Sequence, residues 1–470
     1  MDTRRIAFDI LKKIESEDIF VGEVLDNALR HLQFNDKRDR AFITRLVEGV
    51  VERKISLDFL IEKFSKKSGK PRNGNQNKKN SNNGANIRII LRMGIYQIKY
   101  MESVPDRAAV SEMVDLTKAL GLEGMTGYVN GLLRNVVRAK EDKKLDSFLV
   151  SRMDVRYSTP QWLCDFLVET YGKETARTIL EDQYKDHDTV VRINSLKTSK
   201  EELREMFEEA GVDVKDGILS DRCLRISGYD SIRRLPGFNK GLFTVQDETS
   251  TYTVEHIGIK PGDKVLDICS APGGKSLLAY ELATDGDRAG VIVSRDISDK
   301  KLGKVQENAE RLGVPVRTIE DERTVEVVHS YFPGMNLELG DATELDKGLT
   351  ERSDDEKFDV VIADVPCSGL GVIGRKNDIK YHMTPESLTE LSKQGLLILK
   401  NSSMYIKKKG KICFSTCTIN PQENEKVVRA FLDEYDFEIL DERTFIQGID
   451  SNDGFYFCIM QNKSRGEYGY

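Results

Sequence analysis

Residues 264–282, KVLDICSAPGGKSLLAYEL, decide the fold of the larger part of the chain. A β-type run leads directly into a loop with two adjacent glycines, and a helical run follows. Glycines let the backbone turn tightly and approach a ligand, and the free amides at a helix start favour polar or anionic groups. The spacing fits neither a Walker loop nor the GxGxxG pattern. The loop therefore favours a site for a nucleoside-type cofactor over a plain strand-to-helix turn.

The sequence on either side continues this pattern, because β-type runs alternate with amphipathic helical runs from Gly262 onward. The further β-type runs are VIVSRDI, FDVVIAD and KICFST. Such alternation predicts a doubly wound, mainly parallel sheet with its ligand site at the carboxyl ends of the strands. Asp296 ends the second run, 29 residues after Asp267, where a carboxylate would meet a pair of ribose hydroxyls.

Two cysteines follow two of these runs. Cys367 lies in DVPCSGLGV at 364–372, and Cys417 lies in STCTINPQEN at 415–424. Because the carboxyl ends of parallel strands meet at one edge of a sheet, we expect both thiols to converge on the cofactor crevice. Methyltransferases that act on amino groups of nucleic acids carry an aromatic residue in the corresponding loop, so a cysteine there argues against that class.

A thiol at this edge suits methylation of carbon 5 of a cytosine. That carbon is a poor nucleophile until a thiolate adds to carbon 6 and creates an enamine-like adduct. Asp364 is placed to stabilise the adduct, either as a protonated acid or as a hydrogen-bonding partner of the activated base. The residues alone leave open which of the two cysteines attacks.

The remaining cysteines fit a simpler interpretation, in which a buried cysteine packs as a small hydrophobe. This applies to Cys164, Cys223, Cys413 and Cys458. The total of seven is odd, and the paired CxxC spacing of a zinc site is missing, so we expect reduced thiols and no metal. The charged N-terminus excludes a signal peptide or membrane span, which predicts a soluble cytoplasmic protein.

The N-terminal part of the chain differs in both pattern and charge. Apolar residues recur at helical spacing through residues 1–142, which predicts an all-α domain. Residues 1–150 carry 28 Lys and Arg against 21 Asp and Glu, whereas the whole chain has a net charge of −7. Local cations, not net charge, determine affinity for phosphates, so we expect any RNA-binding surface to be partly concentrated here. Residues 65–86, rich in Asn and Lys, read as a disordered basic loop.

A small α/β module follows, for which we expect residues 150–255. It contains helical runs at 160–171 and 199–210, and β-type runs at 190–194, 223–226 and 242–245. The catalytic domain then occupies 256–470. A length of 470 residues agrees with two to three domains.

These motifs together resemble those of a known family. CSAPGGK at 269–275, DVPCSGLGV at 364–372 and STCTINPQEN at 415–424 are similar to the signature motifs of RNA 5-methylcytosine methyltransferases. RRIAFDILKKIE at 4–15 and ILRMGIYQIKYM at 90–101 resemble the NusB-like domain of the bacterial Sun/Fmu/RsmB branch. The resemblance covers nearly the whole chain. It implies an all-α NusB-like domain, a small RRM-like module and a Rossmann-like methyltransferase domain.

The resemblance also implies roles for individual residues. The nucleophile would be Cys417, Cys367 would assist release of the methylated base, and Asp364 and Lys275 would complete the catalytic set. Arg192 and Asn194 would belong to the RNA-facing module. S-adenosyl-L-methionine would be bound by Cys269, Ser270, Ala271, Pro272, Gly273, Gly274, Lys275, Asp296, Asp341 and Asp364. Residues 318–335 interrupt the family pattern before Asp341 and read as an insertion.

The implied reaction is methylation of small-subunit ribosomal RNA, at a site of the cytosine 967 type in the 16S molecule, by a monomeric enzyme. The same chemistry on another RNA, such as transfer RNA, is the nearest alternative, because the catalytic motifs do not encode the target. A non-catalytic RNA-binding factor is a second alternative, opposed by the presence of both cysteines, Asp364 and Lys275.

Overall fold

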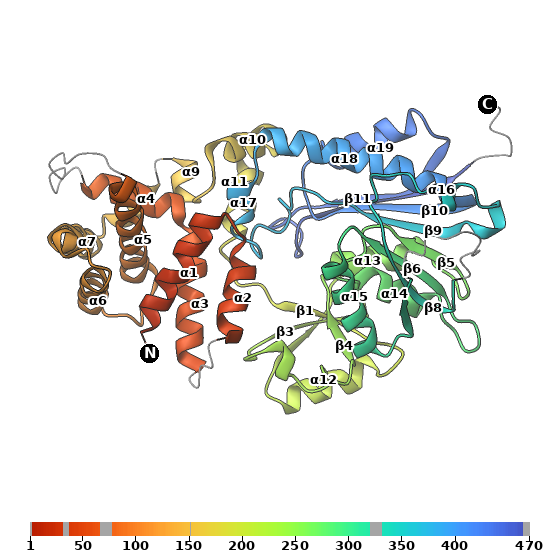
Figure 1. Cartoon of the computed structure of the whole chain (residues 1–470), viewed down its shortest axis with the longest axis horizontal. Coiled ribbons are helices and arrows are strands. Elements are labelled where there is room, and N and C mark those ends of the chain that lie inside the picture. The colour runs from red at the N-terminus through yellow and green to blue at the C-terminus, as the bar shows by residue number, and fades with distance from the viewer. Residues whose placement is uncertain (1, 32–36, 66–77, 151, 320–330, 464–470) are drawn as a thin grey trace. The chain divides into compact units, whose positions relative to one another are not determined.

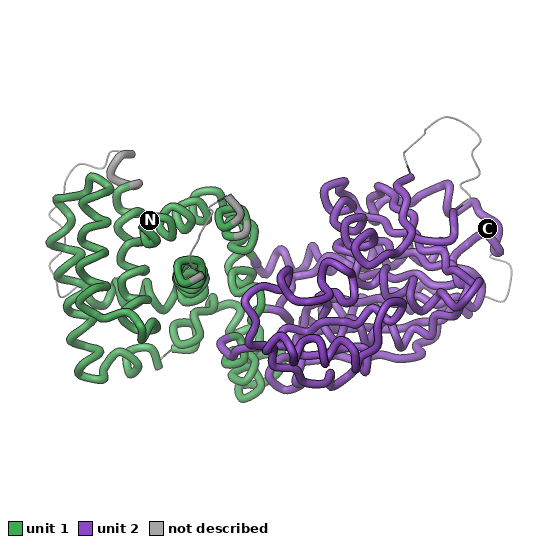
Figure 2. Tube along the Cα trace, turned by 90° about the horizontal axis from the view of Figure 1, so that it is seen from below, with its two compact units in different colours: residues 1–183, 373–382 green, residues 184–372, 383–470 purple. Residues whose placement is uncertain are grey.

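The structure, a computed structural model, describes residues 2–31, 37–65, 78–150, 152–319 and 331–463. It separates into two compact units, which Figure 2 colours differently. Unit 1 comprises residues 1–183 together with 373–382, and unit 2 comprises 184–372 and 383–470. The short segment 373–382 thus belongs to the helical unit, although the chain reaches it from the catalytic part.

Unit 1 is built from helices around one hydrophobic core (Figure 1). Asp2 caps the first helix, because its carboxylate accepts the backbone N–H groups of Arg4 and Arg5 at 3.1 Å. Apolar residues at helical spacing, such as Phe8, Leu11 and Leu133, are fully buried. The elements are α1 (Thr3–Glu17), α2 (Val21–His31), α3 (Lys37–Glu52), α4 (Lys54–Ser65), α5 (Lys78–Tyr100), α6 (Asp106–Ala119), η1 (Glu123–Met125), α7 (Thr126–Glu141), α8 (Leu145–Leu149), α9 (Met153–Arg156), α10 (Gln161–Tyr171), α11 (Lys173–Asp182) and α17 (Ile379–His382).

Unit 1 departs from the sequence expectations in three places. Helix α5 begins at Lys78, so the later part of the predicted disordered loop 65–86 is helical, while 66–77 lie outside the described residues. By their contacts α10 and α11 group with the helical unit, whereas we expected residues 150–183 in the small module, and the position of this domain boundary stays a prediction. The segment between strands β9 and β10 of the catalytic domain also contributes helix α17 to unit 1. Composition and local order do not reveal such tertiary packing.

The small α/β module opens unit 2. Its sheet has the order β2-β3-β1-β4, and β1 pairs antiparallel with both β3 and β4. Ser199 and Glu202 form a capping box that starts its helix. The elements are β1 (Thr189–Ile193), α12 (Lys200–Glu209), β2 (Asp213–Asp216), β3 (Cys223–Ser227), η2 (Ile232–Arg234) and β4 (Phe243–Val245). The predicted β-type and helical runs are confirmed, and β2 was missed because it is short and polar.

The catalytic domain is centred on an eight-stranded sheet of order β11-β12-β10-β9-β5-β6-β8-β7. The pairs from β10 to β7 are parallel, and β12 runs antiparallel to both its neighbours. The prediction of a mainly parallel sheet is therefore confirmed. The strands are β5 (Lys264–Asp267), β6 (Val291–Asp296), β7 (Val316–Thr318), β8 (Gly334–Leu339), β9 (Phe358–Asp364), β10 (Ile406–Thr416), β11 (Phe437–Phe445) and β12 (Phe455–Asn462).

Helices cover both faces of this sheet, and Figure 1 shows the two layers. Two separate hydrophobic cores fill the space between the sheet and each layer. One layer holds α13 (Glu248–Ile257), α14 (Gly274–Leu282) and α15 (Asp299–Leu312), and the other holds α16 (Lys347–Thr350), η3 (Asp354–Glu356), α18 (Pro385–Met404) and α19 (Glu425–Leu432). This arrangement places the ends of β5, β6, β9 and β10 at one common edge.

The presumed insertion at 318–335 is shorter than expected. Thr318 still belongs to the edge strand β7, and Gly334 and Met335 begin β8, which pairs with β6 inside the sheet. Residues 320–330 lie outside the described residues.

Among the helices of the described chain, none is long and apolar enough to cross a membrane.

Candidate active site

The loop after β5 has the conformation that its glycines suggested. Gly273 has φ of +100°, which an L-residue rarely adopts, and a Cβ there would lie 3.0 Å from the side chain of Val305. The backbone amides of Ser270 and Gly273 are held at 2.8 Å and 2.7 Å by the carbonyls of Arg295 and Ser270. The loop is therefore fixed between two strands at the start of α14.

Buried oxygen atoms around this loop lack partners. Among the buried polar side-chain atoms that the structure describes, Asp267 Oδ1, Ser270 Oγ and Asp296 Oδ1 have no hydrogen bond. Lys301 lies 3.4 Å from Asp296 Oδ1 as an ion pair. Unsatisfied buried polar atoms are costly, so their clustering indicates a ligand that supplies hydrogen-bond donors. Hydroxyl pairs and an amino group, as in a nucleoside-type cofactor, fit this set.

Burial also affects the charge of Asp267. Burial raises the pKa of its carboxyl to about 7. The hydrogen bond from Ser276 Oγ at 2.6 Å and the positive charge of Lys275 act in the opposite direction and lower this pKa, but burial has the larger effect. Asp341, by contrast, follows β8 at the same edge and accepts the Thr343 amide at 2.8 Å and its hydroxyl at 2.7 Å. Its role toward a cofactor stays a prediction.

The two cysteines meet as the strand order suggested. Asp364 of β9 and Ser415 of β10 are register partners, and each cysteine follows two or three residues later. The Sγ atoms of Cys367 and Cys417 lie 3.3 Å apart, close enough for an S–H···S hydrogen bond. Both side chains are half-buried, whereas the other predicted packing cysteines are buried.

Lys275 and Asp364 form an ion pair in the same site. Lys275 Nζ donates to Asp364 Oδ2 at 2.7 Å and lies 3.3 Å from Ser250 Oγ, and Ser415 Oγ donates to Asp364 Oδ1 at 2.7 Å. Burial alone would lower the pKa of Lys275, but the charge and hydrogen bond of Asp364 raise it, with smaller electrostatic contributions from Asp267 and Cys417. Lys275 is therefore a cation, and its field reaches Cys417.

Cys367 has the opposite electrostatic environment. Its hydrogen bond with Cys417, burial and the nearby Glu423 carboxylate all raise the pKa of Cys367. Glu423 itself is buried and accepts Ser368 N at 2.7 Å, Ser368 Oγ at 2.6 Å and Asn420 Nδ2 at 2.8 Å. These hydrogen bonds join the two cysteine loops. The raised pKa of Cys367 favours it as the protonated thiol of the pair.

Glu423 and Ser368 were not found from the sequence. Both lie inside the quoted cysteine motifs, but a serine and a glutamate in turn-like segments are also ordinary surface residues. The cation that could promote a thiolate was missed as well. Lys275 was assigned through the cofactor loop, and only the fold brings it beside Asp364.

Comparisons with known proteins agree with this arrangement. Residues 255–460 match the model described as 16S rRNA methyltransferase RsmB/F, 1–138 the NusB family, and 159–233 the RsmF/B-like ferredoxin-like domain. The chain is 30% identical to the probable ribosomal RNA small subunit methyltransferase B of Bacillus subtilis, over 98% of both chains. It is 32% identical to the protein of the same description from Synechocystis, over 93% of this chain and 90% of that one.

The chain belongs to the RsmB/F methyltransferase family. A solved structure titled PH0851 has a TM-score of 0.74 at 18% identity, with 98% of this chain and 99% of that chain covered, which supports the fold. The family match confirms the predicted order of a NusB-like helical domain, a small ferredoxin-like module and a Rossmann-like methyltransferase domain.

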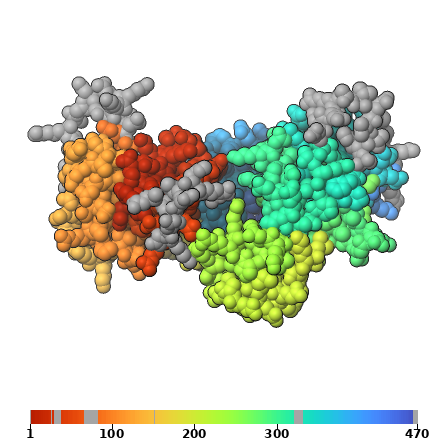
Figure 3. All heavy atoms as spheres, turned by 60° about the horizontal axis from the view of Figure 1, so that its bottom comes forward, coloured from red at the N-terminus to blue at the C-terminus, as the bar shows by residue number. Residues whose placement is uncertain are grey.

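Two residues of this RsmB/F chain do not lie where the resemblance implied. Arg192 and Asn194 were expected to face RNA, but their side chains are 0% and 1% exposed. Arg192 forms a buried ion pair with Glu281 of α14, and its Nε donates to Gln246 Oε1 at 2.7 Å. In Figure 3 the yellow-green module lies against the green and teal part of the catalytic domain.

Asn194 has the same structural character. Its Nδ2 donates to the carbonyl of Gly241 at 2.8 Å and to that of Leu312, at the end of α15, at 2.9 Å. The assignment of Arg192 and Asn194 to RNA binding is therefore corrected: both attach the small module to the catalytic domain.

In the described part of the chain, no group of three or more His, Cys, Asp or Glu side chains could hold a metal ion.

Proposed function

We propose that this protein transfers a methyl group from S-adenosyl-L-methionine to carbon 5 of a cytosine in 16S ribosomal RNA, at a site of the cytosine 967 type. The observation that carries the proposal is the pair of thiols 3.3 Å apart, with Lys275 acting on Cys417 and Glu423 on Cys367. Family membership and the relatives' descriptions as small-subunit ribosomal RNA methyltransferases support the choice of RNA.

In this proposal Cys417 is the nucleophile. The Lys275 ammonium favours its thiolate, and the neighbouring Cys367 thiol can donate a hydrogen bond to it. The Cys417 sulfur forms a bond to carbon 6 of the cytosine, and the electron pair of the ring double bond moves to carbon 5. Glu423 makes the alternative, ionisation of Cys367, less favourable, so the two roles differ for a physical reason.

Asp364 is assigned as an acceptor for the exocyclic amine of the cytosine. Its two oxygens accept hydrogen bonds from Lys275 Nζ and Ser415 Oγ, so Asp364 acts as a hydrogen-bond acceptor in this site. With a side chain 32% exposed, it can accept a further hydrogen bond from a base in the site.

The cofactor supplies an electrophilic methyl group on a sulfonium. Ser270, Asp267 and Asp296 would hold it through the oxygen atoms that have no hydrogen bond. After methyl transfer, a base removes the proton from carbon 5 and the bond between Cys417 and carbon 6 breaks, with its electron pair returning to sulfur. We assign assistance in this release to Cys367.

Two cysteine variants test the proposal. Cys417→Ala should abolish methylation of a 16S ribosomal RNA transcript while retaining cofactor binding. Cys367→Ala should accumulate a protein–RNA adduct that survives denaturing electrophoresis, because addition proceeds and release fails. Cys164→Ala, a buried cysteine of the helical unit, serves as control and should stay active.

Other outcomes would change the assignment. Full activity of Cys417→Ala would contradict the mechanism, and an adduct in Cys417→Ala but not in Cys367→Ala would exchange the roles. Bisulfite sequencing of RNA from a deletion strain tests the target. Loss of one methylated cytosine from 16S ribosomal RNA is expected, whereas loss from a transfer RNA would contradict the proposed substrate.

A further inference from the structure

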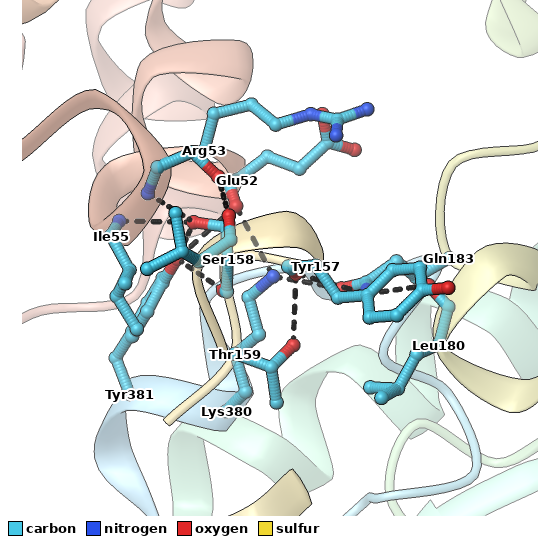
Figure 4. Close-up of polar contacts among 12 residues, drawn as sticks. Glu52, Arg53, Ile55, Tyr157, Ser158, Thr159, Leu180, Gln183, Lys380 and Tyr381 are labelled. Carbon is cyan, nitrogen blue, oxygen red and sulfur yellow. Dashed lines mark hydrogen bonds and ion pairs between the residues drawn. The ribbon is translucent and has the colours of Figure 1, made fainter. Parts of the chain in front are cut away.

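Residues 373–382 form a strap that begins directly after the Cys367 loop and belongs to the helical unit. The sequence of the strap is IGRKNDIKYH. Figure 2 colours it with unit 1, and Figure 4 shows its end among residues of that unit. The proposed reaction uses none of its side chains.

The C-terminal end of the strap is buried. Lys380 is fully buried, and its Nζ donates to Gln183 Oε1 at 2.7 Å and to the Glu52 carbonyl at 3.1 Å (Figure 4). Burial lowers the pKa of Lys380 to about 7. The hydroxyl of Tyr381 donates to the carbonyls of Glu52 at 3.1 Å and Ser158 at 3.0 Å. These contacts hold the strap at the junction of α3, α9 and α11.

A second contact fixes the strap to the start of α2. Asp378 is buried, and its Oδ2 accepts the backbone N–H of Val21 at 2.6 Å. A carboxylate at a helix N-terminus is a favourable partner for the unpaired amides there. The ring of His382 lies 4.5 Å from that of Phe20. The strap is thus a structural part of the helical unit over residues 378–382.

The chain is equally constrained just before the strap. Gly371 N donates to the carbonyl of Cys417 at 3.1 Å, and Gly454 N donates to the carbonyl of Gly371 at 2.7 Å. A Cβ on Gly371 would lie 2.0 Å from the Gly454 oxygen, so this approach requires glycine. Residues 372–377 therefore connect Gly371, which is hydrogen-bonded to the Cys417 backbone in unit 2, to the buried end of the strap in unit 1.

The tip of this connection is basic and exposed. Arg375 and Lys376 are exposed, and the Lys376 carbonyl accepts Ile379 N at 3.1 Å in a turn. Within the described chain, no hydrogen bond or ion pair engages the Lys376 ammonium. Lys376 lies five positions after Gly371, so their Cα atoms lie within about 18 Å of each other. A cation at that distance from the cysteine loop can reach the RNA backbone near a base in the site.

We propose that the strap is an RNA-positioning element: Arg375 and Lys376 bind backbone phosphates next to the target base, and the buried end at Asp378, Lys380 and Tyr381 holds them in place. The proposal rests on the proposed function in taking RNA as the substrate. Fixed cations lose less conformational entropy on binding than flexible ones, which favours phosphate contacts at such a tip.

A charge-removal experiment tests the contact. The variant Arg375→Gln/Lys376→Gln is compared with Lys408→Gln/Lys409→Gln, which removes two exposed charges from the early part of β10, eight residues before the Cys417 end. Binding of a 16S ribosomal RNA transcript is measured over a range of salt concentrations. Two lost contacts should reduce the slope of log affinity against log salt by about 1.4, taking roughly 0.7 per phosphate on a single strand.

The control variant should keep the wild-type slope, and an unchanged slope in the strap variant would overturn the proposal. Binding does not require methylation, so this result is independent of the Cys417→Ala test. If the wild-type protein does not methylate the transcript but the strap variant shows the reduced salt slope, the strap still contacts RNA. Only the proposed reaction is then wrong.

A second experiment separates positioning from a merely structural role. Insertion of Gly-Gly after Val372 leaves every buried contact of the strap intact but loosens its link to the cysteine loop. We expect kcat to fall about 10- to 100-fold with little change in RNA affinity. The same insertion after His382, toward α18, is the matched control and should preserve kcat. Equal activity of the two insertions would overturn the positioning role.

Discussion

Two regions of unit 2 contain buried charged side chains, and they use them differently. At the junction of the small module, Arg192 pairs with Glu281, and both side chains are at most 2% exposed. At the catalytic edge, Lys275 pairs with Asp364, but Asp364 is 32% exposed and nearby oxygens of Asp267 and Asp296 have no hydrogen bond. Arg192 Nη2 and Gln246 Nε2 at the junction have no hydrogen bond either, so the two regions differ in exposure: Asp364 is accessible to a ligand, whereas Arg192 and Glu281 are not.

The strongest test of this contrast is at the junction. Arg192→Met removes the direct partner of the buried Glu281 carboxylate and leaves only the Ser195 hydroxyl at 3.1 Å and Arg222 at 3.9 Å, which should lower the free energy of unfolding by about 3 kcal/mol. Chemical denaturation measures the change. Arg204→Met is the control, because Arg204 pairs with Asp216 at the exposed surface of the same module and should lose at most about 1 kcal/mol.

The second substitution sharpens the interpretation. Arg192→Met combined with Glu281→Leu removes both charges and should recover much of the lost stability. If Arg192→Met instead leaves stability unchanged and weakens RNA binding directly, Arg192 is an RNA contact after all and the correction made from its burial is wrong.

The sequence could predict the catalytic edge because its information is local. Strand ends, glycine loops and cysteines stand next to one another in the motifs, and a parallel sheet brings such ends together by its topology. The pairing of Cys367 with Cys417 and the position of Asp296 follow from that rule. The strength of the motifs also gave the family and the order of domains.

The sequence could not predict contacts between distant segments. Arg192 and Asn194 lie in a β-type run whose outer side could have faced RNA, and only α14 and α15 packing on it buries them. The strap looked like an ordinary loop of the catalytic domain, because its partners Glu52, Ser158 and Gln183 are far away in the chain. Local propensity carries no signal for either packing.

At the catalytic edge, Lys275→Met removes the cation beside Cys417 and Asp364. Loss of one preorganised electrostatic contact should lower kcat by about 100- to 1000-fold. Single-turnover methylation of the RNA transcript measures it. Lys411→Met is the control, because Lys411 lies in the middle of β10 and its Nζ donates to the Ile257 carbonyl at 2.6 Å. An equal decrease of kcat in both variants would mean that Lys275 has only a structural role.

Asp267 offers the smallest effect and the most direct test of an open site. Burial raises its pKa to about 7 in the folded, cofactor-free protein, above the value of about 3.9 in an unfolded chain. Between these values the folded protein holds a proton that the unfolded chain has released. Stability from this group is thus fully present below about pH 4 and is lost as the pH rises toward 7.

Between pH 5 and pH 6 the cofactor-free protein should therefore lose about 1.4 kcal/mol of stability relative to Asp267→Asn, which cannot titrate. Urea denaturation at the two pH values, compared between wild type and variant, isolates this contribution from other groups. A cofactor amino group placed against Asp267 Oδ1 would lower the pKa of the carboxyl, so saturating cofactor should flatten the difference. Identical pH dependence of both proteins without cofactor would mean that Asp267 is already charged in the folded protein, and the proposed link between its protonation and cofactor binding would be wrong.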